Sequence, residues 1–328
     1  MSLPFIPLIS IIIPFYNSEK TIVRCIESIV FEPGKSYEII CVDDGSSDRS
    51  SELIKSLQRN NANIKLISMG TNKGLYLARL EGIKKSHGKY IGFLDSDDYV
   101  SKDYFNILLT TAIKKKTDIC VGQIINVNAE GVKYLQTRCA RFPYLQENQD
   151  DVNVYNMFWN QAGTCYHWHV VWNKIYKRTL FKKSMRVLKE QKKHLVMTED
   201  FIFSAVVLKN VGSYATNENA KYYYVENQNS QTKNRGEAAI KKSLQDIKNA
   251  FDFVEHFLKN INQGAMFFAK FYAWKELYHK IWKNNLLDAG ISEEDSEQLI
   301  YDNWEYYPLQ QRQYVDNYYY EVAKILND

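Results

Sequence analysis

Apolar runs alternate regularly with amphipathic segments along the first 125 residues of the chain. Five runs that are apolar throughout predict buried strands at residues 8–14, 37–42, 64–68, 90–94 and 119–123. Between these runs, apolar positions recur at helical spacing, which predicts four helices that start near residues 18, 46, 74 and 102. Gly88 suits the left-handed position that follows the third of these helices. Buried strands separated by helices predict an α/β fold with a mainly parallel sheet covered on both faces.

The pattern changes after this region. Residues 124–235 are less regular, and from residue 236 onward the chain is helical in pattern and rich in aromatic residues and lysine. We therefore expect one domain over residues 1–235, with halves 1–123 and 124–235, and a helical C-terminal extension over residues 236–328.

Polar clusters follow three of the predicted strands at the point where each strand ends. They are Pro14-Phe15-Tyr16-Asn17, Asp43-Asp44-Gly45-Ser46 and Asp95-Ser96-Asp97. The carboxyl ends of parallel strands lie at one edge of a sheet, and ligands of doubly wound folds bind beyond that edge. The sequence therefore predicts a ligand site built from these three clusters.

The cluster after the fourth strand favours a metal ion. Asp95 and Asp97 are two residues apart, so in an extended segment their side chains leave the backbone on the same side. Two like charges held close together are costly unless a cation neutralises them. Mg²⁺ and Mn²⁺ bind one or two carboxylates and complete their shell with phosphate oxygens and water. The alternative is an acidic turn that caps the next helix, and for Asp98 the helix cap is the preferred interpretation.

Composition bounds the function without deciding it. The 328 residues have a formal net charge of +4, and we find no basic arm or zinc-finger spacing, so nucleic acid is not an expected partner. Five scattered cysteines without a C-x-x-C pair, and the lack of a secretory signal pattern, predict a cytoplasmic protein with reduced thiols. No uninterrupted apolar run approaches the ~20 residues that span a bilayer.

Two common nucleotide-binding motifs are absent from the first strand–helix turn. Neither G-x-G-x-x-G nor the P-loop pattern occurs there, where the chain has Pro14-Phe15-Tyr16-Asn17-Ser18 instead. A nucleotide would therefore have to be bound by other means.

Four motifs occur in an order and spacing that closely resemble inverting glycosyltransferases of family 2, which have the GT-A fold. They are residues 11–17 (IIIPFYN), residues 42–48 (VDDGSSD), Asn72-Lys73-Gly74 with Ala78-Arg79, and residues 94–98 (LDSDD). The resemblance covers roughly residues 5–125 and continues more weakly through Trp172-Asn173-Lys174, Thr198-Glu199-Asp200 and the tyrosines near 222, as in bacterial polysaccharide-type members.

The resemblance implies a donor site for a nucleotide-diphosphate sugar. The residues that it assigns to the nucleotide-sugar are Pro14, Tyr16, Asn17, Asp43, Asp44, Asn72, Arg79, Asp95 and Ser96. Asp95 and Asp97 would hold the divalent metal, Mn²⁺ or Mg²⁺, with Asp97 the direct ligand. A carboxylate that accepts from a uracil N–H favours UDP, while dTDP and GDP stay open. A helix-capping turn is the alternative for Asp44, and a surface ion pair is the alternative for Arg79.

The same resemblance implies an acceptor side. Asp200 is the expected general base, although without the resemblance a helix N-cap would be preferred there. Glu199 would point elsewhere, toward hydroxyls of the bound sugars, while Trp172 would stack on a sugar and Lys174 would meet a phosphate. Core packing and a solvated lysine are the alternatives for these last two. A packed histidine pair is preferred over a metal role for His167 and His169.

The expected function is metal-dependent, inverting transfer of a sugar from a UDP-sugar to a saccharide or lipid-linked saccharide in surface polysaccharide assembly. Without a Q-x-x-R-W motif or a transmembrane helix, addition of one sugar per event is expected. The alternative is a catalytically silent nucleotide- or glycan-binding module. A sugar nucleotidyltransferase is a third possibility, but such enzymes usually have a Gly-rich, basic loop after the first strand, and this chain has none there. A helix packed in the protein is the preferred interpretation of residues 265–274 and the nearby Lys270, Lys275, Lys280 and Lys283. The alternative is a peripheral contact with a membrane. The oligomeric state stays open.

Overall fold

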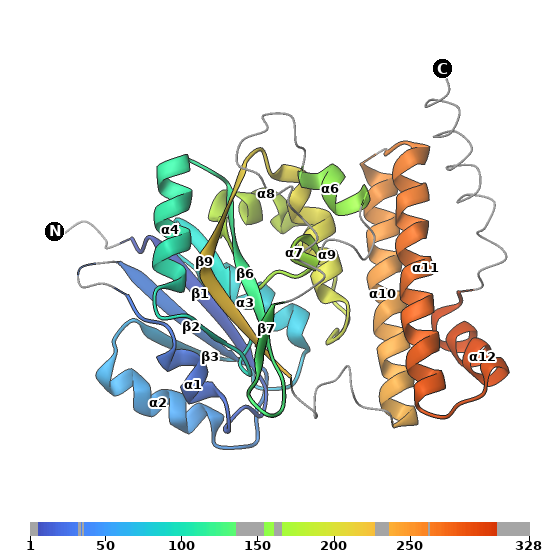
Figure 1. The fold of residues 1–328 in the computed structure, drawn as a ribbon, viewed down its shortest axis with the longest axis horizontal. Coiled ribbons are helices and arrows are strands. Elements are labelled where there is room, and N and C mark those ends of the chain that lie inside the picture. The colour runs from blue at the N-terminus through green and yellow to red at the C-terminus, as the bar shows by residue number, and fades with distance from the viewer. Residues whose placement is uncertain are drawn as a thin grey trace.

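The computed structural model describes residues 6–31, 34, 36–135, 154–160, 166–226, 236–261 and 263–306 of the chain. Its centre is one sheet in the strand order β3-β2-β1-β4-β8-β6-β9-β5, with β7 paired to β6 (Figure 1). The strands are β1 (Ile9–Phe15), β2 (Tyr37–Asp43), β3 (Ile64–Ser68), β4 (Tyr90–Phe93), β5 (Tyr99–Val100), β6 (Ile119–Val127), β7 (Lys133–Leu135), β8 (Lys174–Lys177) and β9 (Tyr214–Val225).

The sheet is mixed rather than mainly parallel. Strands β3, β2, β1 and β4 are parallel to one another, as the repeated strand–helix pattern predicts. Strand β8 then enters between β4 and β6 and is antiparallel to both. The repeated strand–helix pattern covers only the first 125 residues, whereas β8 and β9 come from the less regular part of the chain.

Helices flank the sheet on both faces, and further helices stand beside it at the C-terminal end of the described chain (Figure 1). They are α1 (Ile22–Glu27), α2 (Ser50–Asn60), α3 (Leu75–Lys85), α4 (Tyr104–Lys115), α6 (Val154–Asn160), α7 (Tyr166–His169), α8 (Arg178–Leu188), α9 (Glu199–Val207), the short 3₁₀ helix η1 (Leu208–Asn210), α10 (Glu237–Asn260), α11 (Ala265–Asp288) and α12 (Glu293–Trp304).

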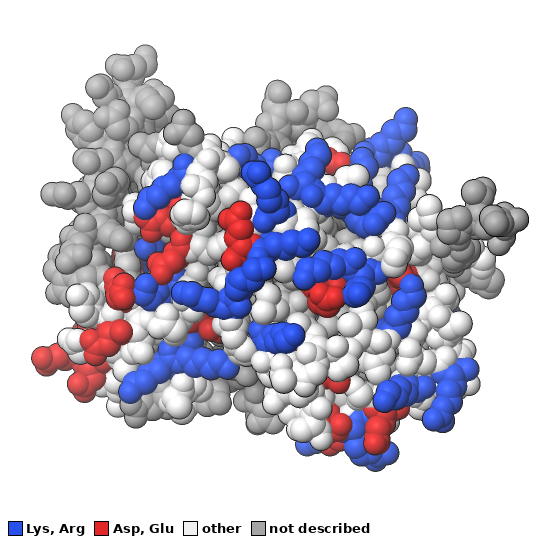
Figure 2. Space-filling view, turned by 180° about the vertical axis from the view of Figure 1, so that it is seen from behind, with Lys and Arg blue, Asp and Glu red and all other residues white. Residues whose placement is uncertain are grey.

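Neighbouring residues of β4 show which helix lies on which face. A Cβ on Gly92 would lie 2.8 Å from Phe105 of α4, whereas Phe93 packs against Phe181 of α8 and Phe203 of α9. Successive side chains of a strand point to opposite faces, so α4 covers one face and α8 and α9 the other. Helix α3 shares the face of α8, and seen from that side the surface is rich in lysine and arginine (Figure 2).

Two local predictions differ from the structure. The first helix begins at Ile22 with Thr21 in the capping position, and Asn17, which has a positive φ of 50°, belongs to a turn. Gly88 has no positive φ, so it is not a helix-capping residue. A Cβ at Gly88 would lie 2.4 Å from the backbone N of Ser10, so the position needs glycine because β1 passes so close to it.

Asp98 is not a helix cap, which corrects the preferred interpretation from the sequence. Helix α4 starts at Tyr104, with Asp103 in the capping position. The buried Asp98 carboxylate instead accepts hydrogen bonds from Tyr222 Oη (2.7 Å) and from the backbone N of Val225 (2.8 Å). It thereby holds the end of β9 next to the segment that carries Asp95 and Asp97.

The C-terminal helices pack against the sheet domain through α9. Phe201 of α9 contacts the rings of Phe251 on α10 and Trp274 on α11, and α10 and α11 stand side by side (Figure 1). Lys275 is buried and is ion-paired with Glu255, so α11 is a packed helix. No helix in the described part of the chain is both long and apolar enough to cross a bilayer.

Candidate active site

A cleft of about 1340 Å³ opens where β1, β2 and β4 end. Among its lining residues are eight that the sequence assigns to the donor or the metal: Pro14, Tyr16, Asn17, Asp44, Asn72, Asp95, Ser96 and Asp97. The structure therefore brings the three polar clusters to one edge of the sheet. Their roles in binding remain predictions.

Hydrogen bonds join the turns after the three strands. The backbone N of Asn17 donates to Ser46 Oγ (3.0 Å), and Asn17 Oδ1 accepts from the backbone N of Ser47 (2.8 Å). On the other side, Ser18 Oγ and Ser96 Oγ are 2.8 Å apart. The three turns thus form one connected rim, and the positive φ of Asn17 is the backbone feature that turns the chain there.

The two neighbouring aspartates after β2 have different positions. Asp43 accepts from the backbone N of Ser46 and from Ser51 Oγ and does not line the cleft, so its nucleotide contact stays a prediction. Asp44 lines the cleft and accepts from the backbone N atoms of Lys73 (2.7 Å) and Gly74 (2.8 Å). Burial raises the pKa of Asp44, while these two N–H donors oppose the rise. Asp44 therefore fixes the loop that presents Asn72 to the cleft.

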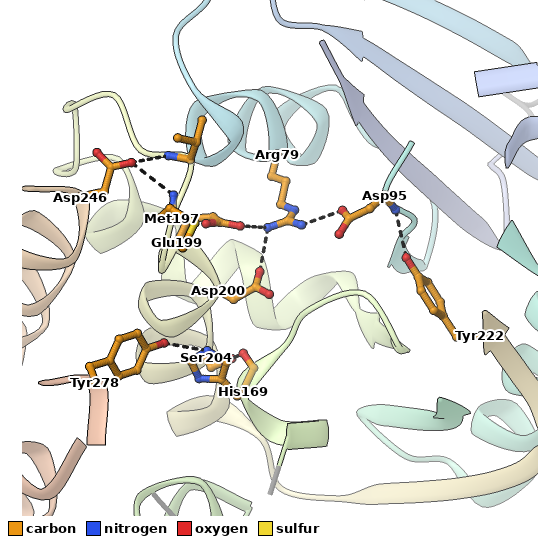
Figure 3. Close-up of polar contacts among 11 residues, drawn as sticks. Arg79, Asp95, His169, Met197, Glu199, Asp200, Ser204, Tyr222, Asp246 and Tyr278 are labelled. Carbon is orange, nitrogen blue, oxygen red and sulfur yellow. Dashed lines mark hydrogen bonds and ion pairs between the residues drawn. The ribbon is translucent and has the colours of Figure 1, made fainter. Parts of the chain in front are cut away.

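Arg79 is the centre of a cluster of three carboxylates (Figure 3). Its Nη2 atom lies 2.7 Å from Asp95 Oδ1, and its Nη1 atom lies 2.6 Å from Glu199 Oε1 and 2.7 Å from Asp200 Oδ1. The side chain is only 1% exposed and does not line the cleft. The guanidinium therefore joins Asp95, at the cleft, to Glu199 and Asp200 at the start of α9. Its predicted nucleotide contact stays a prediction.

One guanidinium is shared by three carboxylates here, and the excess of negative charge affects the pKa values of these carboxyl groups. Burial, followed by the charge of Asp200, raises the pKa of Glu199 to about 8, although Arg79 opposes the rise. Burial also raises the pKa of Asp200 to about 6, with Arg79 lowering it and Asp95 raising it. A carboxylate with a pKa near neutrality, held in place by a fixed cation, has the properties of a general base. That role of Asp200 remains a prediction.

Trp172 and Lys174, which the sequence assigns to the acceptor, are both buried. The Trp172 ring is stacked on Tyr222 and Tyr224 with centroid distances of 4.4 and 5.4 Å. Lys174 Nζ donates to Val170 O and to Asn173 Oδ1. Neither residue lines the cleft, but Tyr224 does, so Trp172 supports a cleft wall from behind. Their contacts with the acceptor remain predictions.

His169, the described member of the His-x-His pair, is packed against aromatic residues. His169 Nε2 lies 2.9 Å from Tyr278 Oη, and the imidazole ring is stacked on Trp274. Burial, followed by the charge of Lys174, lowers the pKa of His169 to about 4. These contacts fit the packed pair preferred from the sequence, while the side chain of His167 lies outside the described part of the structure.

Sequence reasoning missed a second wall of the cleft. His194, Val196 and Lys242 line it, and His194 Nε2 lies 2.8 Å from Asn72 Oδ1. Lys242 comes from α10, so the C-terminal helices contribute to the site. No motif marks these residues, and only the pattern of the long α10 helix was visible in the sequence.

Asp246 of α10 holds the loop that forms this wall. Its Oδ2 atom accepts from the backbone N atoms of Val196 (2.9 Å) and Met197 (3.3 Å), which Thr198 separates from Glu199 and Asp200 (Figure 3). Helix α10 is thereby tied to the segment that presents the carboxylate cluster.

Replacing Asp246 by Ala is expected to lower the free energy of unfolding by about 1–3 kcal/mol, because two N–H groups lose their acceptor. Urea unfolding measures this change. Asp246→Asn keeps an acceptor oxygen and should lose less. Asp252→Ala on the same helix removes an exposed ion pair and should cost at most about 1 kcal/mol. Equal losses for Asp246→Ala and Asp252→Ala would contradict this role of Asp246.

Comparisons with known proteins agree with the geometry. A family model described as Glycosyl transferase family 2 matches residues 10–188. EpsJ of Bacillus subtilis (strain 168), named as an uncharacterized glycosyltransferase, is 32% identical over 248 residues, which are 73% of this chain and 67% of EpsJ. The poly(ribitol-phosphate) beta-glucosyltransferase of Bacillus spizizenii is 30% identical over 224 residues, which are 66% of this chain but only 32% of that protein.

Solved structures show the same fold. A crystal structure of Staphylococcus aureus TarS superposes with a TM-score of 0.58 at 20% identity and covers 90% of this chain and 54% of TarS. The structure of TarS residues 1–349 in complex with UDP-GlcNAc gives a TM-score of 0.53 at 20% identity and covers 93% of this chain and 91% of that chain. The predicted GT-A fold class, an α/β sheet flanked by helices with further C-terminal helices, is confirmed.

Proposed function

Because the chain belongs to glycosyltransferase family 2, we propose that it moves a sugar from a UDP-sugar to a hydroxyl of a saccharide acceptor, with inversion at the anomeric carbon. The observation that carries this proposal is the Arg79 cluster, which joins Asp95 at the cleft to Asp200 on α9. Inverting transfer needs the two functions that these carboxylates can serve, a hold on the donor and a base for the acceptor.

The cleft is suited to the donor. Its volume of about 1340 Å³ leaves room for a nucleotide sugar and part of an acceptor, since ligand pockets commonly measure ~300–1,000 Å³. Tyr16, Asn17, Asp44 and Asn72 supply an exposed ring and polar groups for the nucleoside at one end. The complexes of TarS with UDP and with UDP-GlcNAc support a uridine nucleotide as the first donor to test.

A divalent cation fits the other end of the cleft. Among the described residues, no group of three or more His, Cys, Asp or Glu side chains could hold a metal ion by itself. Mg²⁺ and Mn²⁺ need only one or two carboxylates beside phosphate oxygens and water, and Asp95 and Asp97 both line the cleft. Asp97 would be the main ligand, as the resemblance to the family implies, and Asp95, whose Oδ1 atom binds Arg79, would be the second. When bound, Mn²⁺ or Mg²⁺ would supply Lewis-acid stabilisation of the leaving diphosphate.

Asp200 would act as the base on the acceptor. Its carboxylate would take the proton of the acceptor hydroxyl while that oxygen attacks the anomeric carbon from the side opposite the diphosphate. Arg79 orients Asp200 through Oδ1, and the side chain retains 13% exposure, so a substrate hydroxyl can reach it. One base and one attack give inversion, without a covalent enzyme intermediate.

The family and one named relative support a proposal for the acceptor and the cellular setting. A poly(ribitol-phosphate) glucosyltransferase lies among them, which supports a role in the assembly of surface polysaccharide on a saccharide or a lipid-linked saccharide. Nucleotide sugars would be used at the cytoplasmic face of the membrane.

Turnover of UDP-sugars tests this function directly. The full chain is incubated with a panel of UDP-sugars and Mn²⁺, with and without oligosaccharide acceptors, and released UDP is measured. A glycosyltransferase releases UDP from at least one donor. A protein that binds UDP but never releases it from any UDP-sugar would instead be a silent binding module.

Replacing Asp97 by Asn is expected to remove the Mn²⁺-dependent part of UDP-sugar affinity, a loss of about 10–100-fold or more, because a neutral amide is a poor ligand for a hard cation. Calorimetric titration with and without EDTA measures this loss. Asp103→Asn, at the exposed start of α4, is the matched control and should bind like wild type. If neither EDTA nor Asp97→Asn changed the affinity for the UDP-sugar, the metal would have no place in the proposal.

A further inference from the structure

Eight exposed basic residues gather on the side of the molecule that α3 and α8 cover (Figure 2). We call this surface the basic face, and it consists of Lys84, Lys85, Lys182, Lys183, Arg186, Lys189, Lys192 and Lys193. The two helices run in opposite directions here. Arg178 at the start of α8 donates to Ser86 O just after α3, and Tyr76 at the start of α3 donates to Leu188 O at the end of α8.

The cations cannot turn away from solvent, because the other side of α8 is part of the core. Leu180, Phe181 and Leu188 are buried, and Phe181 packs edge-on against Phe93 of the sheet. The basic side chains of α8 therefore project from a helix whose orientation is fixed. This keeps the basic side chains of α8 on the solvent side of the helix.

Carboxylates do not balance these charges. Residues 177–193 contain eight lysines and arginines but a single carboxylate, Glu190, although the whole chain has a net charge of only +4. Within the part of the chain that the structure describes, Lys84 and Lys85 share Glu81. By contrast, Lys182, Lys183, Arg186, Lys189 and Lys192 have no ion-pair partner there. An excess of fixed positive charge attracts a partner with many negative charges.

The surroundings of these cations decide which polyanion fits. None of the large apolar or aromatic side chains exposed in the described chain belongs to residues 75–93 or 177–209. Single-stranded nucleic acid would use exposed aromatic rings for stacking, and a protein partner would need an apolar centre. Anionic lipid headgroups require neither, because a cluster of lysine and arginine is sufficient to hold a protein at their surface.

We propose that the basic face docks this glycosyltransferase on the surface of an anionic bilayer. The face reaches the cleft, because Lys192 and Lys193 directly precede His194, which lines it. Docking would therefore place the mouth of the cleft beside the headgroups. This position would serve an acceptor carried on a lipid, and that part of the inference rests on the proposed function.

Vesicle flotation of the full chain tests the docking. We expect the protein to bind vesicles of phosphatidylcholine mixed with phosphatidylglycerol and to ignore vesicles of phosphatidylcholine alone. Binding should be lost in high salt, because the Debye length falls from ~10 Å at 0.1 M to ~3 Å at 1 M. The triple variant Lys182→Gln, Lys183→Gln, Arg186→Gln should partition on the order of 100-fold more weakly.

A second triple variant controls for net charge. Lys55→Gln, Arg59→Gln and Lys114→Gln remove the same charge from exposed positions on α2 and α4 and should bind like wild type. Equal losses in both triple variants, equal binding to neutral vesicles, or displacement from the vesicles by equimolar duplex DNA would each overturn the proposal. Release of UDP from UDP-sugars in solution is measured on the same variants. A protein that docks without turnover would retain this inference and lose the proposed function.

Discussion

Replacing Asp200 by Asn should slow sugar transfer by about 10²–10⁴-fold, because the amide cannot take the proton of the acceptor hydroxyl. The affinity for UDP should stay close to that of wild type, since Asp200 does not line the donor cleft. The amide oxygen can still accept from Arg79 Nη1, so the cluster should survive the substitution. Transfer rates under saturating donor, together with the Kd of UDP, separate a chemical defect from a binding defect.

The pH dependence adds a second readout for the same residue. Wild-type transfer should rise with pH through about 6, because Asp200 acts only when it is deprotonated and burial raises its pKa to about that value. The Asp200→Asn variant should lack this acid limb.

Glu199→Gln is the matched control for Asp200, because Glu199 binds the same Nη1 atom of Arg79. Because its own pKa is raised to about 8, Glu199 is already protonated where Asp200 titrates, so the neutral glutamine should leave the acid limb near pH 6, with a smaller loss of rate. If Glu199→Gln lost the larger share of activity, the base would be Glu199 instead.

The strands and the edge that bears the site could be predicted from sequence because both depend on local patterns. The run at residues 64–68 is β3 to the residue, and each predicted polar cluster follows a strand of the parallel half. In a parallel sheet the carboxyl ends share one edge by topology, so three clusters far apart in the chain had to meet.

The carboxylate cluster could not be predicted because its contacts are not local. Arg79 and Asp200 are 121 residues apart, and in the sequence an arginine on a helix reads equally well as a surface ion pair. Asp98 shows the same limit, since a helix cap is the local expectation while its actual partner, Tyr222, lies 124 residues away. Lys242 on α10 reaches the cleft only because the C-terminal helices pack against α9. The local sequence pattern predicts a helix at α10, but it does not show that this helix packs against α9.

Replacing Arg79 by Met should lower the free energy of unfolding by about 3–5 kcal/mol near neutral pH, because three carboxylates lose the one guanidinium that they share. Urea unfolding at several pH values measures this deficit. Without the cation, the folded variant holds these carboxyl groups at pKa values above those of the unfolded chain. It therefore binds more protons than the unfolded chain, and its stability falls as pH rises. The deficit should be larger at about pH 8 than at about pH 5.

Two control variants isolate the geometry from the charge. Arg79→Lys keeps a cation but lacks the planar fork that bridges three carboxylates, so it should recover only part of the stability. Arg49→Met removes an ion pair whose side chains are both more than 70% exposed, and its effect should stay within about 1 kcal/mol. An Arg79→Met variant as stable as Arg49→Met would contradict the structural role of the cluster.

Kinetics of the Arg79 variants distinguish positioning from nucleotide binding. Since Arg79 lowers the pKa of Asp200, its loss should move the acid limb of transfer to higher pH while the Kd of UDP changes little. A direct contact between Arg79 and the donor would instead raise that Kd, whether or not the acid limb moves. The first outcome assigns Arg79 to holding Asp95 and Asp200 together, as its burial and its three carboxylate partners indicate.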